Sequence, residues 1–455
     1  MKPSVLMLAT VVCVVLLAPV GAVGLDAPVK VTGNEEMAAL PGITGTGTEI
    51  DPFVIEGMHF EGGAGSPLLA LCDVTAHTIV KDCTFVGAED VALDLQACGN
   101  VWILSCVFSD NALAVSVSAE CTDIVIALNT FERNGEDVDG DAGSVRLDDG
   151  YVGNWWDGNA TFDMSGDGLS EIPYFVCAGE HPLLDMHSLV FPYAGDAADD
   201  EEGVRLEVRF SPGDTYRLVS RAETDMIMHT SELSTRTTLT QNVEYVLQVA
   251  SAPGTGYAEI LLEVVDDSGS LFLNDEPFDY DSVQGTSWTL DSHRFGGGGM
   301  SMTAAGTNPD NAAVLGPIQA SYTFYPVRAI AVGHTWTDVL DPEPTQSGSV
   351  WSTTTAEVSC VFSRLDALRG DACAVIKSHS TAILGGQVMN EATQADVDMS
   401  GTIDTEIMLW VSLATGQTLR TVLSSEGAIE SRMDGEPYMT VEYSMHIETD
   451  LYDDV

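Results

Sequence analysis

The sequence contains very few basic side chains. Lysine and arginine together number 17, against 69 aspartates and glutamates, so the 455-residue chain has a formal net charge of −52. Lysine occurs at only four positions: Lys2, Lys30, Lys81 and Lys377. Nucleic acids and anionic membranes are bound mainly through Lys and Arg. The balance therefore argues against nucleic-acid partners, anionic membrane surfaces and polyanionic substrates.

Long apolar runs are also missing beyond the N-terminus. Lys2 precedes an apolar run over residues 5–18, and the small residues Ala22-Val23-Gly24 follow it. This order is typical of a signal peptide, and the run is shorter than the roughly 20 residues that span a bilayer. We predict a signal peptide over residues 1–24, no transmembrane span after its removal, and an extracellular or cell-surface location.

Cysteine pairs with zinc-site spacing are absent as well. No Cys-x-x-Cys occurs, so the cysteines do not predict a zinc site. An even number in an exported chain permits disulfides, and Cys360 with Cys373 is the plausible distal pair. Five of the cysteines lie in one 50-residue stretch, where burial as an interior column of free thiols is favoured over a disulfide framework. The sequence leaves the disulfide state open for all eight: Cys72, Cys83, Cys98, Cys106, Cys121, Cys177, Cys360 and Cys373.

An internal repeat is the most informative feature that is present. Phe85, Phe108 and Phe131 lie 23 residues apart, and Cys98 and Cys121 repeat at the same interval. Short alternating strands run between them. A period of 20–25 residues with two or three strands predicts a right-handed parallel β-helix of four or five turns. Equivalent side chains would then stack about 4.8 Å apart inside the coil, phenylalanines in one column and thiols in another.

Three motifs carry a family resemblance. GTGTEIDPFVIEG (residues 45–57) resembles the GSGT-x-x-DPYVIEG opening of NosD-type β-helix proteins, and GNWWD (153–157) resembles their GNYWSDY signature. DMSGDGLSEIPY (163–174) is similar to their D-x-DGDGIGDTPY segment, and HPLL (181–184) follows where they have D-x-YPL. The resemblance covers about residues 30–193 and implies a β-helix with a C-terminal cap over residues 25–193. Its members range from accessory proteins of copper-enzyme assembly to surface proteins of unknown role.

One acidic loop has the spacing of a calcium site. Oxygen-bearing side chains alternate before a glycine, as in the D-x-[DN]-x-[DN]-G loop, but a tyrosine holds the twelfth position, where an EF-hand has glutamate. Asp157 or Asp185 could supply the missing ligand, and a solvated acidic turn is the alternative. We predict a structural Ca²⁺ held by four side chains: Asp163, Ser165, Asp167 and Glu171.

The second half of the chain differs in pattern. Residues 194–203 are small and acidic and predict a linker. Residues 204–455 contain long alternating segments, such as 204–210 and 243–249, and no convincing helical period. The sequence therefore predicts an all-β protein: the parallel β-helix followed by an antiparallel domain built as a curved sheet or half-barrel.

A weaker resemblance concerns this second domain. Phe210-x-Pro212-Gly213-Asp214-x-Tyr216, the Gly-x-x-Trp turn at 333–336 and the segment from 400 to 416 are similar to an uncharacterised group of exported all-β domains. This group carries no known activity.

For function, we expect an exported, non-catalytic binding or scaffold protein of the surface or extracellular space. The expected ligand is a neutral carbohydrate or an envelope protein. The alternative is a glycan-active enzyme, a hydrolase or lyase. Hydrolysis needs two nearby carboxylates, for which Asp94 with Glu120 or Asp148 are candidates. A uronate lyase needs basic side chains, which are scarce.

A second alternative is a copper- or metal-handling accessory protein. Met226-x-Met228-His229 and Met186-His187 offer the soft ligands that Cu(I) prefers. Core methionines beside a surface histidine are the competing interpretation. Motifs of metalloproteases and of serine hydrolases are absent from the sequence.

Overall fold

The computed structural model describes residues 28–453, except for 64, 66, 141–142, 160–161, 178–182, 194–202, 232, 280–281, 283, 296–324, 341–344, 348–349, 391–394 and 434. The predicted signal peptide and nearly all of the predicted linker lie outside the described residues. Among the helices of the described part, none is long and apolar enough to cross a membrane.

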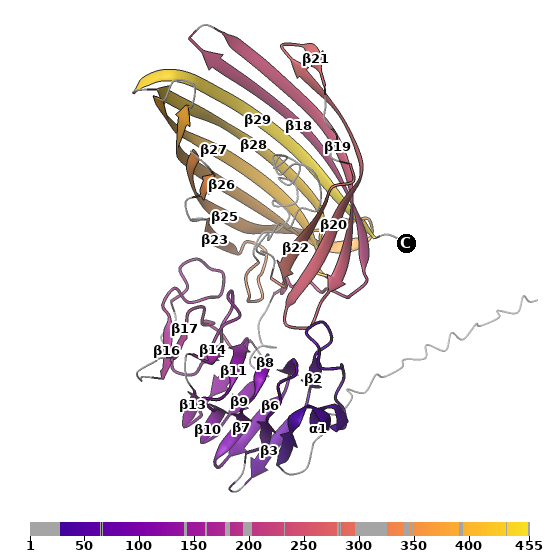
Figure 1. The fold of residues 1–455 in the computed structure, drawn as a ribbon, viewed down its shortest axis with the longest axis vertical. Helices are drawn as coiled ribbons and strands as arrows, with labels where there is room; N and C mark the ends of the chain where they lie inside the picture. Colours follow the sequence, from indigo (N-terminus) through magenta and orange to yellow (C-terminus); the bar gives the residue numbers. More distant parts are fainter. Residues whose placement is uncertain are drawn as a thin grey trace, which may run out of the picture.

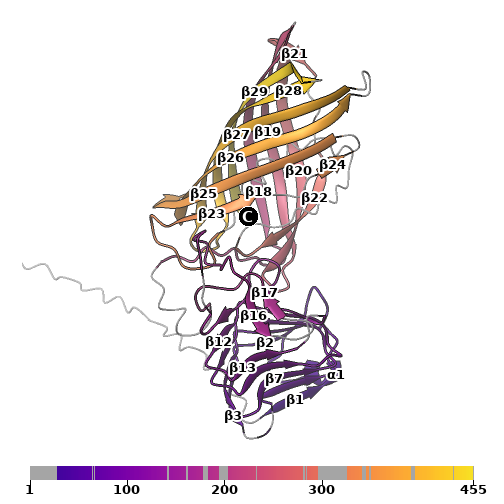
Figure 2. The ribbon, with the colours of Figure 1, turned by 90° about the vertical axis from the view of Figure 1, so that its left-hand side faces the viewer.

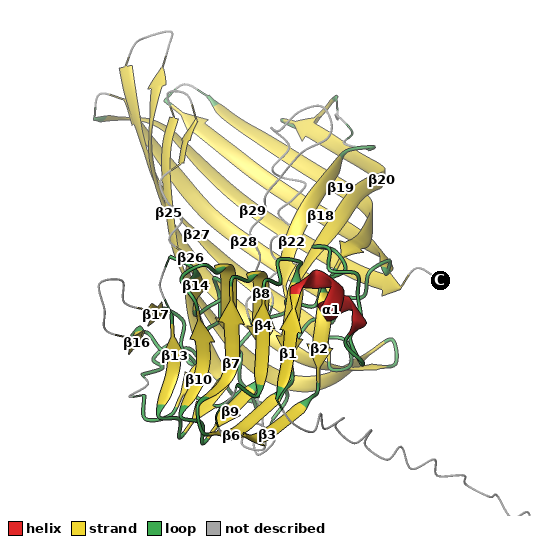
Figure 3. Cartoon of the chain, turned by 60° about the horizontal axis from the view of Figure 1, so that its bottom comes forward, coloured by secondary structure: helices red, strands yellow, loops and turns green. Residues whose placement is uncertain are grey.

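The N-terminal part is a parallel β-solenoid (Figures 1 and 3). Each turn contributes one strand to each of three five-stranded sheets. The first sheet contains β1 (Val29–Thr32), β4 (Leu69–Cys72), β7 (Val91–Gln96), β10 (Leu113–Val117) and β13 (Glu136–Asp139). The second contains β2 (Phe53–Glu56), β5 (Thr78–Lys81), β8 (Gly99–Leu104), β11 (Thr122–Ala127) and β14 (Val145–Arg146). The third contains β3 (His59–Gly63), β6 (Thr84–Ala88), β9 (Val107–Ser109), β12 (Thr130–Glu132) and β15 (Trp155–Trp156).

This arrangement confirms the predicted parallel coil, while its right-handed sense stays a prediction. Helix α1 (Gly33–Ala39), the one helix among the described residues, follows β1 at the first turn and buries Met37. It covers the beginning of the coil, where a bare strand edge would otherwise invite pairing with another chain.

The predicted aromatic column is present inside the coil. Parallel strands place equivalent residues one strand spacing apart, so the rings stack face to face with centroids 4.4–5.4 Å apart. The column is longer than the repeat indicated, and in order it consists of Phe60, Phe85, Phe108, Phe131, Trp156 and Tyr174.

A second interior column changes from thiols to amides. Cys83 and Cys106 occupy it in the earlier turns, and Asn129 and Asn154 in the later ones. The Asn129 side chain accepts from the Cys106 N–H (2.8 Å) and donates to the Ile103 carbonyl (2.9 Å), so its buried polar groups are satisfied. All described cysteine side chains are buried and free, which confirms the interior-thiol interpretation for the five cysteines of the coil. The side chain of Cys177 lies outside the described residues.

The coil ends in a small cap. Strands β16 (Tyr174–Cys177) and β17 (Leu183–Asp185) form an antiparallel hairpin. The carboxylate of Asp185, fully buried, accepts hydrogen bonds from the N–H groups of Asn154 (2.7 Å) and His187 (3.1 Å) and from the Trp156 indole (2.8 Å). A Cβ at Gly153 would lie 1.8 Å from that carboxylate, so only glycine fits there. The Gly-Asn-x-Trp sequence is thus the socket for Asp185.

The C-terminal part is one curved, 12-stranded antiparallel sheet (Figures 1 and 2). Its order is β21-β20-β19-β18-β29-β28-β27-β26-β25-β23, with β22 paired to β20 and β24 to β25. The bounds are β18 (Thr215–Thr230), β19 (Ser234–Ser251), β20 (Tyr257–Leu273), β21 (Glu276–Phe278), β22 (Ser287–His293), β23 (Thr335–Leu340), β24 (Thr345–Ser347), β25 (Val350–Leu368), β26 (Asp371–Asn390), β27 (Ala395–Ser412), β28 (Thr418–Met433) and β29 (Glu436–Asp453).

Two predictions for this part are wrong. Residues 204–210 form no strand: Val204 makes an isolated bridge to Ile330, while Leu206 is buried against the sheet. The alternation there reflects packing against a sheet face instead of pairing within a ladder. Cys360 and Cys373 form no disulfide. Cys360 lies opposite Ser378 on β26, five residues from Cys373, or about 16 Å along the strand, far beyond disulfide reach.

Candidate functional site

The solenoid and the sheet share a buried junction. Its apolar cluster combines solenoid residues with residues from the second half of the chain: Leu128, Val152, Leu189, Phe191, Tyr193, Phe295 and Val327. Two polar contacts lie beside it. The Tyr257 hydroxyl donates to the Asp149 carbonyl (2.8 Å), and His293 Nε2 lies 3.1 Å from Asp149 Oδ2.

The Asp149–His293 contact is fully enclosed. Both side chains have no exposed surface, and the other Asp149 oxygen accepts from the N–H groups of Tyr151 and Val152 at 2.9 Å each. The His293 ring also stacks on Tyr151, with centroids 5.1 Å apart. A buried, fully hydrogen-bonded pair of this kind favours one arrangement of the two parts, because any arrangement that separates the partners leaves a buried polar group unpaired. The junction therefore holds the two parts in a defined arrangement.

A cleft of about 300 Å³ opens beside this junction. We call it the junction cleft and define it by six of its lining residues: His77, Asn100, Trp102, Asp123, Arg146 and Tyr257. Five come from the solenoid, on or next to strands of the second parallel sheet, and the sixth begins β20 of the large sheet.

The strand register explains this placement. Ile79, Trp102, Val125 and Arg146 occupy successive rungs of the second sheet. Their side chains face out of the coil, where Ile79 and Val125 are covered and the Trp102 ring is half-buried. Tyr257 meets Trp102 edge to face, with centroids 6.5 Å apart and planes at 75°. The Tyr257 hydroxyl is fixed by Asp149, so the two rings form a preformed aromatic corner.

The chemistry of this corner suits a polyhydroxylated ligand. Two aromatic rings offer apolar faces, while amide, carboxylate, imidazole and guanidinium groups surround them. Apolar and aromatic walls with a few fixed polar groups are typical of small-ligand sites. Asp123 lies at a position with φ of 55°, where Asp and Asn are tolerated best, so its carboxylate stands out from a tight bend.

The predicted calcium ligands lie together in one loop. Asp163 accepts from the N–H groups of Gly166 (2.6 Å) and Gly168 (3.1 Å), and Glu171 accepts from that of Ser165 (2.8 Å). Burial, together with the smaller effect of the Asp163 and Glu171 charges, raises the pKa of Asp167 to about 6, although hydrogen bonds from Leu169 and Ser165 lower it. The Asp185 carboxylate is hydrogen-bonded within the cap and does not lie with the predicted calcium ligands.

Within the described part of the chain, no three His, Cys, Asp or Glu side chains converge as a metal-binding group. The carboxylates of the loop mostly hold backbone N–H groups, which a calcium loop also does in part. Calcium binding by Asp163, Ser165, Asp167 and Glu171 stays a prediction.

Sequence reasoning did not show that this loop contacts the large sheet. The carbonyls of Ser165, Gly166 and Asp167 accept from Thr337 N (2.8 Å), His334 Nε2 (2.8 Å) and Val327 N (2.9 Å), respectively. At Gly166, φ is +80° and a Cβ would lie 2.6 Å from a backbone carbonyl of β23, so glycine is needed for the close approach. The loop thus joins the cap to the turn that precedes β23.

The three carboxylates that were candidates for hydrolysis lie at two different sites of the solenoid. Asp94 and Glu120 line one shallow groove on the first solenoid sheet, where Gln96 donates to Asp94 (2.7 Å). Asp148 lies elsewhere, 3.5 Å from His187. Burial would raise the pKa of Asp148, but the hydrogen bond and charge of His187 outweigh it and lower that pKa. The hydrogen bond with Asp148 in turn raises the pKa of His187.

The candidate copper ligands do not share a face. Met226, Met228 and His229 lie on β18, where successive side chains point to opposite sides of the sheet. His229 therefore points away from both methionines. Met186 is half exposed, and its neighbour His187 lies beside Asp148. This geometry does not favour the metal-handling alternative.

Comparisons with known proteins give no identity. No family model matches the sequence, and no curated protein matches it. Among solved structures, a candidate exported protein with a YmcC-like fold from Bacteroides fragilis is 10% identical, with a TM-score of 0.17 over 52% of this chain and 97% of that one.

Two further solved structures give similar values. A variant of the Rh. blastica porin is 8% identical (TM-score 0.18; 50% of this chain, 99% of that one). OccK2 from Pseudomonas aeruginosa is 9% identical (TM-score 0.19; 53% and 98%). Similarities at such TM-scores carry no argument about function or about family.

Proposed function

We propose that the chain is an exported, non-catalytic binding protein and that the junction cleft binds a neutral carbohydrate. The observation that carries the proposal is the aromatic corner of Trp102 and Tyr257, with hydrogen-bonding side chains around it. Sugar rings present C–H faces that pack on aromatic rings and hydroxyls that bond to groups such as those of Asn100 and Asp123.

The charge of the chain supports the choice of a neutral ligand. With a net charge of −52, polyuronates and sulfated glycans are repelled at long range. The preformed junction also supports binding, because a rigid cleft loses little conformational freedom when a ligand enters.

The proposal includes the export signal over residues 1–24 and a right-handed, NosD-type coil. The resemblance is supported by the role of its motif residues: Gly153, Asn154 and Trp156 form the socket for Asp185. These motifs serve the cap of the coil, so they fit a binding module as well as any accessory role.

We also propose a structural Ca²⁺ in the loop of Asp163, Ser165, Asp167 and Glu171. Burial is the main cause of the raised pKa of Asp167, and a cation there would favour its ionised form and reduce the smaller repulsion from Asp163 and Glu171. It would also fix the loop against the large sheet, since three loop carbonyls bond to that sheet or to the turns around it.

The binding test uses the chain from residue 25 onward and neutral polysaccharides such as mannan, dextran and a β-glucan. Affinity electrophoresis shows retardation by a bound polymer, and titration calorimetry gives the affinity. Trp102→Ala should weaken binding ten-fold or more. Asp123→Asn keeps the backbone bend and should weaken binding by a smaller factor.

Tyr438→Ala is the matched control, since Tyr438 is an exposed aromatic residue on β29, outside the junction cleft. It should bind as the parent does. Equal loss in Trp102→Ala and Tyr438→Ala, or no retardation by any polymer, would contradict the proposal.

A second candidate, glycan hydrolysis, is favoured only by the shared groove of Asp94 and Glu120. The same polymers are incubated with the protein, with Ca²⁺ or with chelator, and their length is followed by size-exclusion chromatography. Shortening that disappears in Asp94→Asn or Glu120→Gln would replace the binding proposal with an enzyme. Intact polymer that co-elutes with the protein supports binding alone.

A further inference from the structure

The two faces of the large sheet differ sharply in charge. On β18, Leu218, Ala222 and Met226 share one face, while Arg217 and Glu223 lie on the other. The side chains of residues paired across adjacent strands point to the same side of a sheet. The strand register therefore shows which residues of each neighbouring strand lie on the same face. The face that contains Leu218 is called the inner face below.

The segregation continues across the sheet. On β27, the inner face carries Ile403, Ile407 and Leu409, and the outer face carries Asp404 and Glu406. Away from terminal pairs and bulges, the described inner-face residues of β18, β19 and β25 to β29 include no charged side chain. They are aliphatic, Met, Tyr, Phe, Gly, Cys, Ser, Thr or Gln. On β20, the inner face carries Asp267, which is hydrogen-bonded to Gln241 (3.4 Å).

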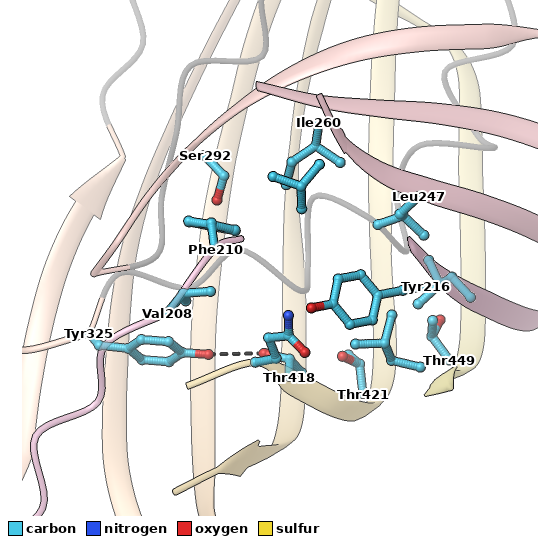
Figure 4. Close-up of a pocket in the computed structure, with 14 residues that line it drawn as sticks. Val208, Phe210, Tyr216, Leu247, Ile260, Ser292, Tyr325, Thr418, Thr421 and Thr449 are labelled. Carbon is cyan, nitrogen blue, oxygen red and sulfur yellow. Dashed lines mark hydrogen bonds between the residues drawn. The ribbon is translucent and has the colours of Figure 1, made fainter. Parts of the chain in front are cut away.

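The inner face is the concave one. A cavity of about 90 Å³ at its base is lined by Ile260 of β20, Leu247 of β19, Tyr216 of β18, Thr449 of β29 and Thr421 of β28 (Figure 4). Strands β20 and β28 are separated by three others in the sheet. Side chains from both can surround one cavity only if the sheet bends around it.

Among the residues that the structure describes, part of this face is covered by other residues and part is not. Near the base, Tyr325 packs over it and donates to or accepts from Thr418 (2.9 Å), as Figure 4 shows. Further along the strands, the aliphatic side chains remain partly exposed, and Met226 has 37% of its surface exposed. An extended, uncharged and concave surface of this kind is unusual in a chain with a net charge of −52.

We propose that the inner face of the large sheet binds the acyl chain of a lipid with no net headgroup charge, with the chain end in the cavity at its base. The proposal is independent of carbohydrate binding in the junction cleft. An acyl chain is long, apolar and uncharged, which matches a concave, uncharged face whose side chains are mostly aliphatic or bear hydroxyls.

The small number of free hydrogen-bonding groups on the inner face favours an acyl chain over a peptide as its ligand. The backbone N–H and C=O groups of the sheet pair with each other in its ladders, and apart from the hydroxyls and the Gln241 amide with its partner Asp267, its described inner side chains offer no strong donor or acceptor for a peptide backbone. A buried peptide would leave its own backbone groups unpaired, which is costly. Methionines such as Met226 and Met445 adapt to irregular apolar ligands. An anionic headgroup would be repelled by the acidic chain.

The test is calorimetric titration of the chain from residue 25 onward with lysophosphatidylcholines of 8, 10 and 12 acyl carbons, below their micelle concentrations. Binding should tighten with length, by up to roughly four-fold for each added methylene that reaches the face. Absence of a length dependence would overturn the proposal.

Two neighbouring isoleucines give a matched pair of variants. Ile403 lies on the inner face of β27, and Ile383 on the outer face of the adjacent strand β26, where it is 60% exposed. Ile403→Asp should weaken binding at least ten-fold, and Ile383→Asp should leave it unchanged. Equal weakening in both would overturn the proposal.

If Ile403→Asp does not fold, Ile403→Thr replaces it, because threonine suits a strand and removes apolar surface without adding charge. It should weaken the 12-carbon ligand more than the 8-carbon one, and an equal effect on both would count against the proposal. Trp102→Ala should bind these lipids as the parent does, which separates this proposal from the carbohydrate proposal.

Discussion

The cap of the solenoid should become more stable as the pH falls from neutral. Burial raises the pKa of Asp185 to about 7 from its ordinary value of 3.8, although hydrogen bonds from Asn154 and Trp156 act in the opposite direction. In the unfolded chain the carboxyl ionises near its ordinary value. Between these two pKa values the folded state binds a proton that the unfolded state does not, so lowering the pH favours folding.

The magnitude follows from the two pKa values. Each pH unit between them is worth about 1.4 kcal/mol. Between pH of about 7.5 and about 5.5, the folded carboxyl of Asp185 goes from mostly ionised to mostly protonated, for a gain of about 2 kcal/mol in the free energy of unfolding. This corresponds to a roughly 25-fold increase in protection against local opening.

Hydrogen–deuterium exchange with mass spectrometry measures this locally. Peptides that cover residues 151–157 report the opening of the socket, after correction for the intrinsic exchange rate at each pH. Wild-type protection should rise about 25-fold over this range. Asp185→Asn, which cannot titrate, should be less protected throughout and should show no such rise.

A neighbouring titratable group needs its own control. The pKa of His187 is raised by its hydrogen bond with Asp148, and its protonation favours folding in the same direction. His187→Gln should retain most of the pH-dependent gain at residues 151–157. If Asp185→Asn keeps the full gain, or if wild-type protection falls on acidification, the reasoning about Asp185 is wrong.

Four further predictions concern packing, thiols, calcium and the junction. Phe108→Ala removes a fully buried ring of the aromatic column and should lower the free energy of unfolding by about 3–5 kcal/mol in urea titrations; a loss below about 1 kcal/mol would contradict the packing. Alkylation in denaturant without reductant should label both Cys360 and Cys373, whereas a protected pair in the mass spectrum would indicate a disulfide. Ca²⁺ should raise the melting temperature of the parent but not of Asp163→Ala, and no effect on the parent would rule the ion out. His293→Ala strands a buried carboxylate and should cost about 3–5 kcal/mol in urea titrations; a cost near zero would mean that the pair is not buried in solution.

The coil could be predicted because each of its turns has the same packing requirements. Each turn places the same residue type at the same point of the cross-section, so Phe85, Phe108 and Phe131 fixed both the period and the column. The ends of the column were not predictable in the same way. Trp156 and Tyr174 occupy the ring position without the sequence spacing that identifies a repeat.

The thiol column shows a similar limit. Cys83 and Cys106 give way to Asn129 and Asn154 at the same interior position. The Cys106 thiol donates to the Val80 carbonyl of the previous turn (3.5 Å), and the Asn129 amide donates to the equivalent Ile103 carbonyl (2.9 Å) and also accepts from the Cys106 N–H. Cysteine and asparagine occupy equivalent positions of the column, so a search for repeated identical residues finds only the cysteine half of it.

The contacts at the junction could not be predicted from the sequence, because they join residues that are far apart in the chain. Asp149 and His293 are far apart in the sequence, and neither belongs to a motif. The corner of Trp102 and Tyr257 likewise needs the loop between β19 and β20 to reach the solenoid. A feature that could have been seen is the outward stripe of Ile79, Trp102 and Val125, since three bulky apolar residues on the solvent side of a coil imply a cover.

That stripe bears on whether the two parts are independent. The acidic segment at residues 194–203 indicates separable domains, yet ending the chain there would uncover Ile79 and Val125 and leave the Asp149 carboxylate without His293. An unpaired carboxylate is tolerated once water can reach it, so the exposed stripe is the larger cost, since apolar burial scales with area. The solenoid should therefore remain folded alone, held by its own aromatic column, but should associate through the stripe that the start of β20 and the loop before it cover in the full chain.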